Sequence, residues 1–343
     1  MPLIGERVLL AGVIVLAIAR IVFNAVAGPT GDVAYAGVFG ADSLHHGWPL
    51  YTVHPTHLDT YGPINYLLYL PFQAAFPLGP GWQNGSMTAA HAAAVTFDLA
   101  VVVLLMAVGR KVRPGRAGRR LGLILAYAWV ACPATLVPLA VSANDAVNAI
   151  VVLLALLAIN SPIASGALLG LGGATKFAPL GLVPLFAGGL RRSVRDAAVC
   201  IAAAAAVFVL AFLPYVHQSG LGTVWDSTLG FQLSRESPFT LWGLHPSLDW
   251  LQPIVKAVAV TITVGVMFFP RERTLLRVAA LAAAVILVLQ MAGNYWAHTY
   301  VAWFAAPAFV ALIGRCAGTA DRVRARPEAE RAPIAGVPVT SGS

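Results

Sequence analysis

Charged residues are scarce in this sequence, and so is cysteine. Only 10% of its 343 residues are charged, against about 25% in a typical soluble domain. The three cysteines, Cys132, Cys200 and Cys316, have no paired spacing, which argues against a disulfide framework and a thiolate metal site. The chain also lacks a P-loop, a GxGxxG fingerprint and a nucleophile-elbow motif. Neither nucleotide binding nor serine-hydrolase chemistry is therefore indicated.

Apolar residues fill the chain instead. They make up 59% of it, and the mean hydropathy is +0.78. Runs approaching the ~20 residues that a helix needs to cross a bilayer recur along the whole length. We therefore predict an all-α polytopic membrane protein with about ten transmembrane helices. The expected spans are residues 8–27, 89–108, 120–138, 145–159, 163–175, 178–190, 197–215, 250–269, 275–293 and 295–314.

Two of these spans, 163–175 and 178–190, are short and interrupted by Gly and Pro. Such segments are typical of half-crossing helices, and here they meet near Lys176. The membrane domain is expected to cover residues 1–318, with a first outer loop at 28–88 and another at 216–249. Residues 319–343 lose all apolar periodicity and are expected to form a disordered cytoplasmic tail.

Basic residues gather in short clusters between the apolar runs. This is the pattern of cytoplasmic loops and not of a nucleic-acid-binding surface. We expect residues 64–79 to lie as a juxtamembrane helix on the outer surface. When the other spans alternate across the membrane, both termini and all but four of the 22 Lys and Arg residues fall on the cytoplasmic side. The exceptions are Arg20, Lys176, Arg235 and Lys256. We expect a multi-pass inner (plasma) membrane protein whose active site faces outside, with lipids and not nucleic acid around it.

Titratable residues concentrate just after the first apolar run. Residues 31–63 hold three aspartates and four histidines. Asp32 lies directly beyond the first span, where a carboxylate can act as a general base; the alternative is an N-cap for a helix starting near Val33. His54 and His57 are three residues apart, but Pro55 disfavours the helix that such a zinc pair needs. We expect no metal.

Lys176 is the only charge in a long apolar stretch. Cations within a membrane are costly and usually functional, and this one stands where two half-helices leave backbone N–H groups free to help bind a phosphate. Its alternative role is to snorkel to outer headgroups.

Aromatic and polar residues alternate in the outer segments 140–149, 217–250 and 293–303. Aromatic faces stack on sugar rings while carboxylates and amides bind their hydroxyls. An interfacial aromatic belt is the alternative.

The order of these stretches resembles the GT-C superfamily of membrane glycosyltransferases. A first helix is followed by GDVAYAGVFGADSLHHGWPLY (31–51) and YGPINYLLYLPF (61–72), as in the opening of those enzymes. The stretch from SAND (142–145) through GATKFAP (173–179) to GGLRR (188–192) is similar to glycosyltransferase family 87, the polyprenol-phosphate-mannose-dependent mannosyltransferases. The chain is short for that family, which leaves the acceptor open.

The resemblance implies a GT-C-like bundle with outer juxtamembrane helices after the first span. It places Asp32 as the catalytic base, Tyr61–Gly62–Pro63 as a juxtamembrane motif and Asn144 at the outer end of a helix. It also implies a donor-binding role for Lys176 and a place near the site for His298.

The implied function is an inverting, polyprenyl-phosphate-sugar-dependent hexosyltransferase of the cell envelope. It would move a sugar, by the resemblance mannose, to a lipid or glycan acceptor outside the membrane without a cofactor. The phosphate would be bound by Lys176 and Arg235. The sugar and acceptor contacts are expected at Tyr35, Tyr61, Asn144, Asp145, Glu236, Trp242, Tyr295 and His298. The alternatives are a transporter or flippase of a lipid-linked or small polar substrate, and a scaffold without chemistry; buried lysines and broken helices also occur in transporters.

Overall fold

The computed structural model describes residues 4–27, 30–52, 58–79, 87–190 and 193–330, and this part of the chain is helical without strands. Five of its helices are long and apolar enough to cross a membrane, or six if one bent pair is counted as a span. The predicted all-α polytopic membrane fold is therefore confirmed. The spans expected at 145–159, 163–175 and 178–190 correspond to shorter apolar helices, and the one at 295–314 corresponds to the start of the last helix, so the count of ten stays a prediction.

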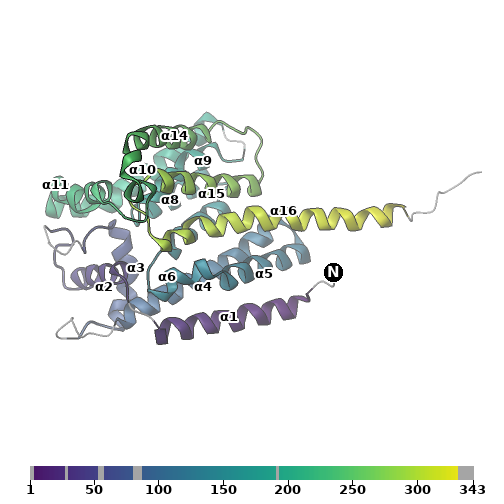
Figure 1. Cartoon of the computed structure of the whole chain (residues 1–343), viewed down its shortest axis with the longest axis horizontal. Helices are drawn as coiled ribbons and strands as arrows, with labels where there is room; N and C mark the ends of the chain where they lie inside the picture. Colours follow the sequence, from purple (N-terminus) through teal and green to yellow (C-terminus); the bar gives the residue numbers. More distant parts are fainter. Residues whose placement is uncertain (1–3, 28–29, 53–57, 80–86, 191–192, 331–343) are drawn as a thin grey trace, which may run out of the picture.

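The first span is followed by two helices that pack on each other. α1 (Glu6–Ala27) leads into α2 (Asp32–His45), and α3 (Pro63–Ala75) begins with a proline at its first position. Gly37 and Gly40 of α2 lie so close to two tyrosine rings of α3 that a methyl group at either position would overlap them. The pair α2 and α3 lies at the end of the molecule opposite to the start of α1 (Figure 1).

The span predicted at 120–138 is not one continuous helix. α4 (Thr88–Val112) is continuous, but the next segment is divided into α5 (Gly115–Ala131) and α6 (Pro133–Ala140), which meet at an angle of 61°. Pro133 has no N–H group to continue the hydrogen bonds of α5, and proline at the first position of a helix favours a new start. α6 consequently leaves the direction of α5 and runs toward the end of the molecule where α2 and α3 lie (Figure 1).

The interruption predicted near Lys176 is present. α7 (Ala146–Leu157) and α8 (Pro162–Gly173) are followed by a non-helical turn, the 3₁₀ segment η2 (Ala178–Leu182) and α9 (Val183–Gly188). Gly166 and Gly170 of α8 have no side chains to hold it away from the backbone of the following long helix at Cys200 and Ala204. Small residues at this spacing are typical of close helix contacts in membranes.

The last third of the chain alternates long helices with short ones. α10 (Val194–Ser219), α14 (Gln252–Gly265) and α15 (Leu275–Ala292) are the long elements. The shorter elements are α11 (Leu221–Trp225), the π-helix η3 (Asp226–Gly230), α12 (Phe231–Ser234), α13 (Leu241–Leu244) and the 3₁₀ helices η4 (Pro246–Leu251) and η5 (His298–Tyr300).

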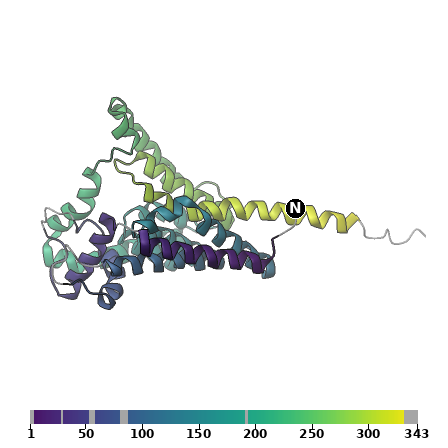
Figure 2. The same ribbon diagram turned by 60° about the horizontal axis from the view of Figure 1, so that its bottom comes forward.

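The final helix, α16 (Val301–Glu330), continues past residue 319, where the tail was expected to begin. Ala, Arg and Glu are frequent in this stretch, and they are strong helix formers; residues 331–343 lie outside the described part. The start of α1 and the end of α16 lie toward the same end of the molecule in both views (Figures 1 and 2).

Candidate active site

A cavity of about 440 Å³ opens where the interrupted segment after α8 faces α12, α14 and the start of α16. Its wall is mostly aliphatic and aromatic, with a few polar groups that converge on it. Its polar and aromatic groups include Tyr61, Lys176, Lys256, Tyr295, Tyr300 and Trp303. An apolar pocket with a small number of placed polar groups is the usual form of a ligand site.

Lys176 is buried in this wall and forms an ion pair. Its Nζ atom lies 2.8 Å from Oδ1 of Asp145, whose side chain is fully buried. The indole N–H of Trp303 donates to the same oxygen at 2.6 Å. The ammonium also lies over the rings of Tyr61 and Trp303, 5.5 and 5.6 Å from their centroids. With 6% of its side chain exposed, Lys176 does not reach headgroups, so the snorkelling alternative is wrong.

Asp32 forms a second ion pair at the start of α2. Its Oδ2 atom lies 3.3 Å from Nη2 of Arg235. The N-cap of α2 is Gly31, and Asp32 stands at the first helical position, where its Oδ1 atom accepts a hydrogen bond from the N–H of Val33 at 2.9 Å. Asp32 therefore also binds a free N–H of the first turn, and the capping alternative stays open beside the catalytic one. The carboxylate occupies the first turn, where the helix dipole favours an anion, and 70% of it is exposed. An exposed carboxylate is accessible to a substrate hydroxyl.

Tyr295 connects this second ion pair to the cavity. The guanidinium of Arg235 lies 3.8 Å from the centroid of the Tyr295 ring, and that ring is part of the cavity wall. Arg235 therefore contacts Asp32 on one side and the wall on the other. Neither Asp32 nor Arg235 is itself a wall residue, so the carboxylate lies beside the wall and is joined to it through Arg235 and Tyr295.

Tyr61 lies within the electrostatic influence of both ion pairs. Burial raises the pKa of its hydroxyl well above the usual value, and the nearby Tyr300, Asp32 and Asp145 raise it further, against an opposing effect of Arg235. The hydroxyl consequently stays protonated at neutral pH and can donate a hydrogen bond.

Gly62 explains how Tyr61 reaches Lys176. Its N–H donates to the carbonyl of Thr175 at 3.2 Å, and Ile64 donates to the carbonyl of Ala174 at 3.0 Å. A methyl group on Gly62 would overlap the Ala174 carbonyl, so only glycine allows this approach. Pro63 then begins α3, which aligns the loop.

We expect Gly62→Ala to separate this loop from the interrupted segment, because the overlap is with backbone atoms that cannot rotate away. A displacement near 1 Å at a site can lower turnover about 100-fold, and we expect a loss of that order in any sugar-transfer assay. Gly79→Ala is the matched control, since a methyl group there meets nothing within 4 Å. Equal activity of the two variants would contradict the role given to Gly62.

The other predicted contacts do not form part of the cavity wall. Asn144 is fully buried and donates to the amide oxygen of Asn65. The indole of Trp242 is buried and donates to the carbonyl of Met291 at 3.2 Å. Further out, Tyr35 stacks on Phe39, His298 packs against Phe239 and Trp296, and Glu236 is exposed.

Most wall residues lie outside the set predicted from the sequence, among them Lys256, Tyr300 and Trp303. The sequence did single out Lys256, because it is one of the four basic residues outside the clusters that were predicted to be cytoplasmic. Its Nζ donates to the side-chain oxygen of Asn294 at 2.8 Å.

The histidine pair considered for a metal, His54 and His57, lies outside the described residues. Within the described ranges, no group of three or more His, Cys, Asp or Glu side chains could hold a metal ion.

Comparison with known sequences identifies one family. The model described as glycosyltransferase family 87 matches residues 60–291, which is more than half of the chain. The match includes Asp145, Lys176, Arg235 and Lys256, while Asp32 and Trp303 lie beyond its ends. No curated protein matches the chain.

Proposed function

Because the chain belongs to glycosyltransferase family 87, we propose that it is an inverting enzyme which transfers mannose from a polyprenyl-phosphate donor to a lipid or glycan acceptor on the outer face of the inner membrane. That it is a membrane glycosyltransferase follows from the family and the apolar helices. The donor, the sugar, the acceptor side and the orientation are the proposal.

The observation that supports the proposal most is the convergence of two ion pairs on one cavity. One pair, Lys176–Asp145, has its lysine in the wall, and the other, Asp32–Arg235, contacts the wall through Tyr295. The proposed reaction needs a base for the acceptor hydroxyl and cations for the leaving phosphate, and two separate ion pairs can supply these at different places.

We propose that the donor phosphate is bound among Arg235, Lys176 and Lys256. An ammonium has three donors, so Lys176 retains donors beyond the one it gives to Asp145. The protonated Tyr61 hydroxyl adds a neutral donor. The polyprenyl chain would lie along the aliphatic part of the wall, where residues of η2 and α15 are exposed to the cavity.

The acceptor hydroxyl would bind at Asp32. The carboxylate takes the hydroxyl proton while the oxygen attacks the anomeric carbon, and the bond to the phosphate oxygen breaks on the opposite face, so the configuration inverts. The positive groups around the cavity stabilise the negative charge that develops on the phosphate.

For the remaining predicted residues the geometry favours two kinds of role. Asn144 and Asp145 are buried behind the wall, so we propose that they hold Lys176 and the adjoining loop. Tyr295 presents its ring to the cavity and suits a sugar face. We propose that Tyr35, Glu236, Trp242 and His298 act on the acceptor side, by direct contact or by supporting the outer segments there.

Lys256→Gln is expected to raise the KM for the donor about tenfold with little change in kcat. Removing one charge-assisted hydrogen bond loses about 1.5 kcal/mol, and 1.4 kcal/mol is a factor of ten. Initial rates over a series of donor concentrations measure this. Lys256→Arg should retain binding, and Arg271→Gln, which removes an exposed charge at another cavity, should change nothing. An unaltered KM in Lys256→Gln would remove Lys256 from the donor site.

One assay tests the proposed function and separates it from transport. Purified protein in proteoliposomes receives radiolabelled polyprenyl-phosphate mannose and an extracted lipid or glycan pool. Transfer of label to a new product, absent with Asp32→Asn, supports the enzyme. Movement of intact labelled donor across the bilayer without a new product supports the flippase. Parallel donors that carry another hexose or a pentose establish which sugar is used.

A further inference from the structure

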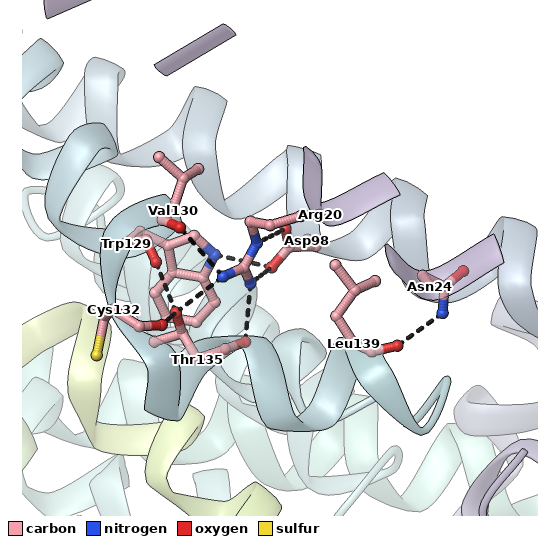
Figure 3. Close-up of polar contacts among 8 residues, drawn as sticks. All are labelled: Arg20, Asn24, Asp98, Trp129, Val130, Cys132, Thr135 and Leu139. Atoms are coloured by element: carbon pink, nitrogen blue, oxygen red, sulfur yellow. Dashed lines mark hydrogen bonds and ion pairs between the residues drawn. The ribbon is translucent and has the colours of Figure 1, made fainter. Parts of the chain in front are cut away.

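Arg20 and Asp98 form an ion pair inside the membrane-spanning bundle (Figure 3), and neither residue is part of the cavity wall. The guanidinium of Arg20 on α1 donates twice to the carboxylate of Asp98 on α4, at 2.7 and 3.0 Å. The indole N–H of Trp129 donates to the same carboxylate at 2.8 Å. Both ionic side chains are almost completely buried. Buried charges within a membrane segment call for a function or a strict structural reason.

The same guanidinium also holds the bend between α5 and α6. It donates to the carbonyl of Val130 on one side of the bend at 3.4 Å and to the carbonyl of Thr135 on the other side at 2.8 Å. Figure 3 shows the Arg20 side chain between these two carbonyls and Asp98. The last carbonyls of α5, that of Val130 among them, have no partner further along the helix. Arg20 binds this carbonyl and one carbonyl of α6, and thereby joins α6 to α1 and α4.

One turn further along α1, Asn24 holds the other end of α6. Its amide donates to the carbonyl of Leu139 at 2.6 Å and to the hydroxyl of Ser142 at 2.9 Å (Figure 3 shows the first of these bonds). Because residues four apart lie on the same face of a helix, Arg20 and Asn24 bind the two ends of α6 from one side.

The end of α6 lies close in the structure or in the chain to one residue of each ion pair of the site. The carbonyl of Val141 accepts a hydrogen bond from the N–H of Gly31 at 2.9 Å, directly before Asp32. Four residues after Val141, the chain reaches Asp145, the partner of Lys176. α6 is therefore the structural element that Asp32 and Asp145 have in common.

We infer that Arg20 is a positioning residue: through the α5–α6 bend it sets the relative positions of Asp32 and the Lys176–Asp145 pair. This inference rests on the proposed function, because it assigns to Arg20 an effect on the transfer step. Arg20 touches no part of the cavity wall, and the account requires that its loss lowers kcat without removing the donor contacts of Lys256 and Arg235.

Arg20→Lys is the first test. Lysine keeps a positive charge beside Asp98 but has no planar fork that can reach the carboxylate and both carbonyls. We expect kcat to fall at least tenfold and the donor KM to stay within about threefold of the wild-type value, since a small displacement of reacting groups affects mainly the chemical step. An unaltered kcat would overturn the inference.

A cross-link provides the readout that a merely structural arginine would not affect. A Cβ atom at position 31 would lie 3.7 Å from Cβ of Val141, within the 3.5–4.5 Å range of disulfides. Gly31→Cys with Val141→Cys therefore joins the start of α2 to the end of α6. In the Arg20→Lys background, we expect the oxidised protein to recover most of the lost kcat and to lose it again in dithiothreitol.

The matched control is Arg273, a second buried arginine. It donates to the carbonyls of Leu185 within α9, of Val266 directly after α14 and of Pro270 in the turn that follows, all far from α6 in the chain. Arg273→Lys should lower the midpoint of thermal unfolding, and the 31–141 cross-link should not change its kcat.

Two further measurements keep the outcomes distinct. If Arg20→Lys yields no monodisperse protein, Asn24→Ala takes its place, with the same expected loss and the same rescue. A folded variant in which mass spectrometry confirms the cross-link and kcat stays low would overturn the inference. A different outcome is that neither the wild type nor the cross-linked protein with native Arg20 transfers any sugar. That result would contradict the proposed function and not the role of Arg20.

Discussion

Asp32→Asn is expected to lower sugar transfer about 1,000-fold while the donor still binds. A general base contributes about 10²- to 10⁴-fold to a rate, and asparagine cannot accept the acceptor proton. The substitution keeps the shape of the side chain and an oxygen for Arg235, so the contact between Arg235 and Tyr295 is retained. Transfer is measured with radiolabelled donor under single-turnover conditions, and donor binding is measured separately with the labelled lipid.

The control for Asp32→Asn is Asp249→Asn, which neutralises another exposed carboxylate, in η4. It should keep full activity, and both variants should unfold at nearly the wild-type temperature. Turnover within about tenfold of wild type in a folded Asp32→Asn protein is incompatible with a base at this position, given the size of such effects.

The second large effect is expected at Lys176. Lys176→Met leaves the fully buried carboxylate of Asp145 with the indole of Trp303 but without a cation. Removing one partner of a buried ion pair destabilises a protein by about 3–5 kcal/mol. We therefore expect a marked drop in the midpoint of thermal unfolding together with loss of transfer, so this variant alone does not separate the structural from the functional role of Lys176.

A double variant makes the separation. Lys176→Met with Asp145→Asn removes both charges, and the amide oxygen can still accept from Trp303. We expect thermal stability to return most of the way to the wild-type value, while transfer stays at least 100-fold reduced because the phosphate has lost a cation. A stable double variant with normal transfer would show that the pair serves folding alone.

The apolar pattern of the sequence was sufficient to predict most of the long helices. The spans expected at 8–27, 89–108, 197–215 and 275–293 each correspond to a helix that could cross a membrane. Hydropathy averages over a window and does not register where a helix bends. The division at Pro133 was therefore not predicted. The continuation of α16 beyond residue 319 was not predicted either, because that stretch has no apolar periodicity.

For the site, the sequence indicated which residues were unusual but not what they contact. Lys176 was predicted to be functional because it is a charge in an apolar stretch, and its partner Asp145 was predicted to be a sugar contact. The two are 31 residues apart, and only the packing of α7 against α8 brings them together. The same holds for Arg20 and Asp98, which are 78 residues apart. A distant ion pair leaves no local pattern, so sequence reasoning could identify the charged residues and not the pairs.

The central claim is that Asp32 and Lys176 act on a single sugar-bearing lipid. A cryo-electron microscopy map of the Asp32→Asn variant in nanodiscs with polyprenyl-phosphate mannose tests it most directly, because this variant should hold the donor without consuming it. The account predicts density for a phosphate beside Lys176, Lys256 and Arg235, with the sugar extending toward residue 32. Donor density bound elsewhere, or a phosphate at Lys176 whose sugar points away from residue 32, would contradict it.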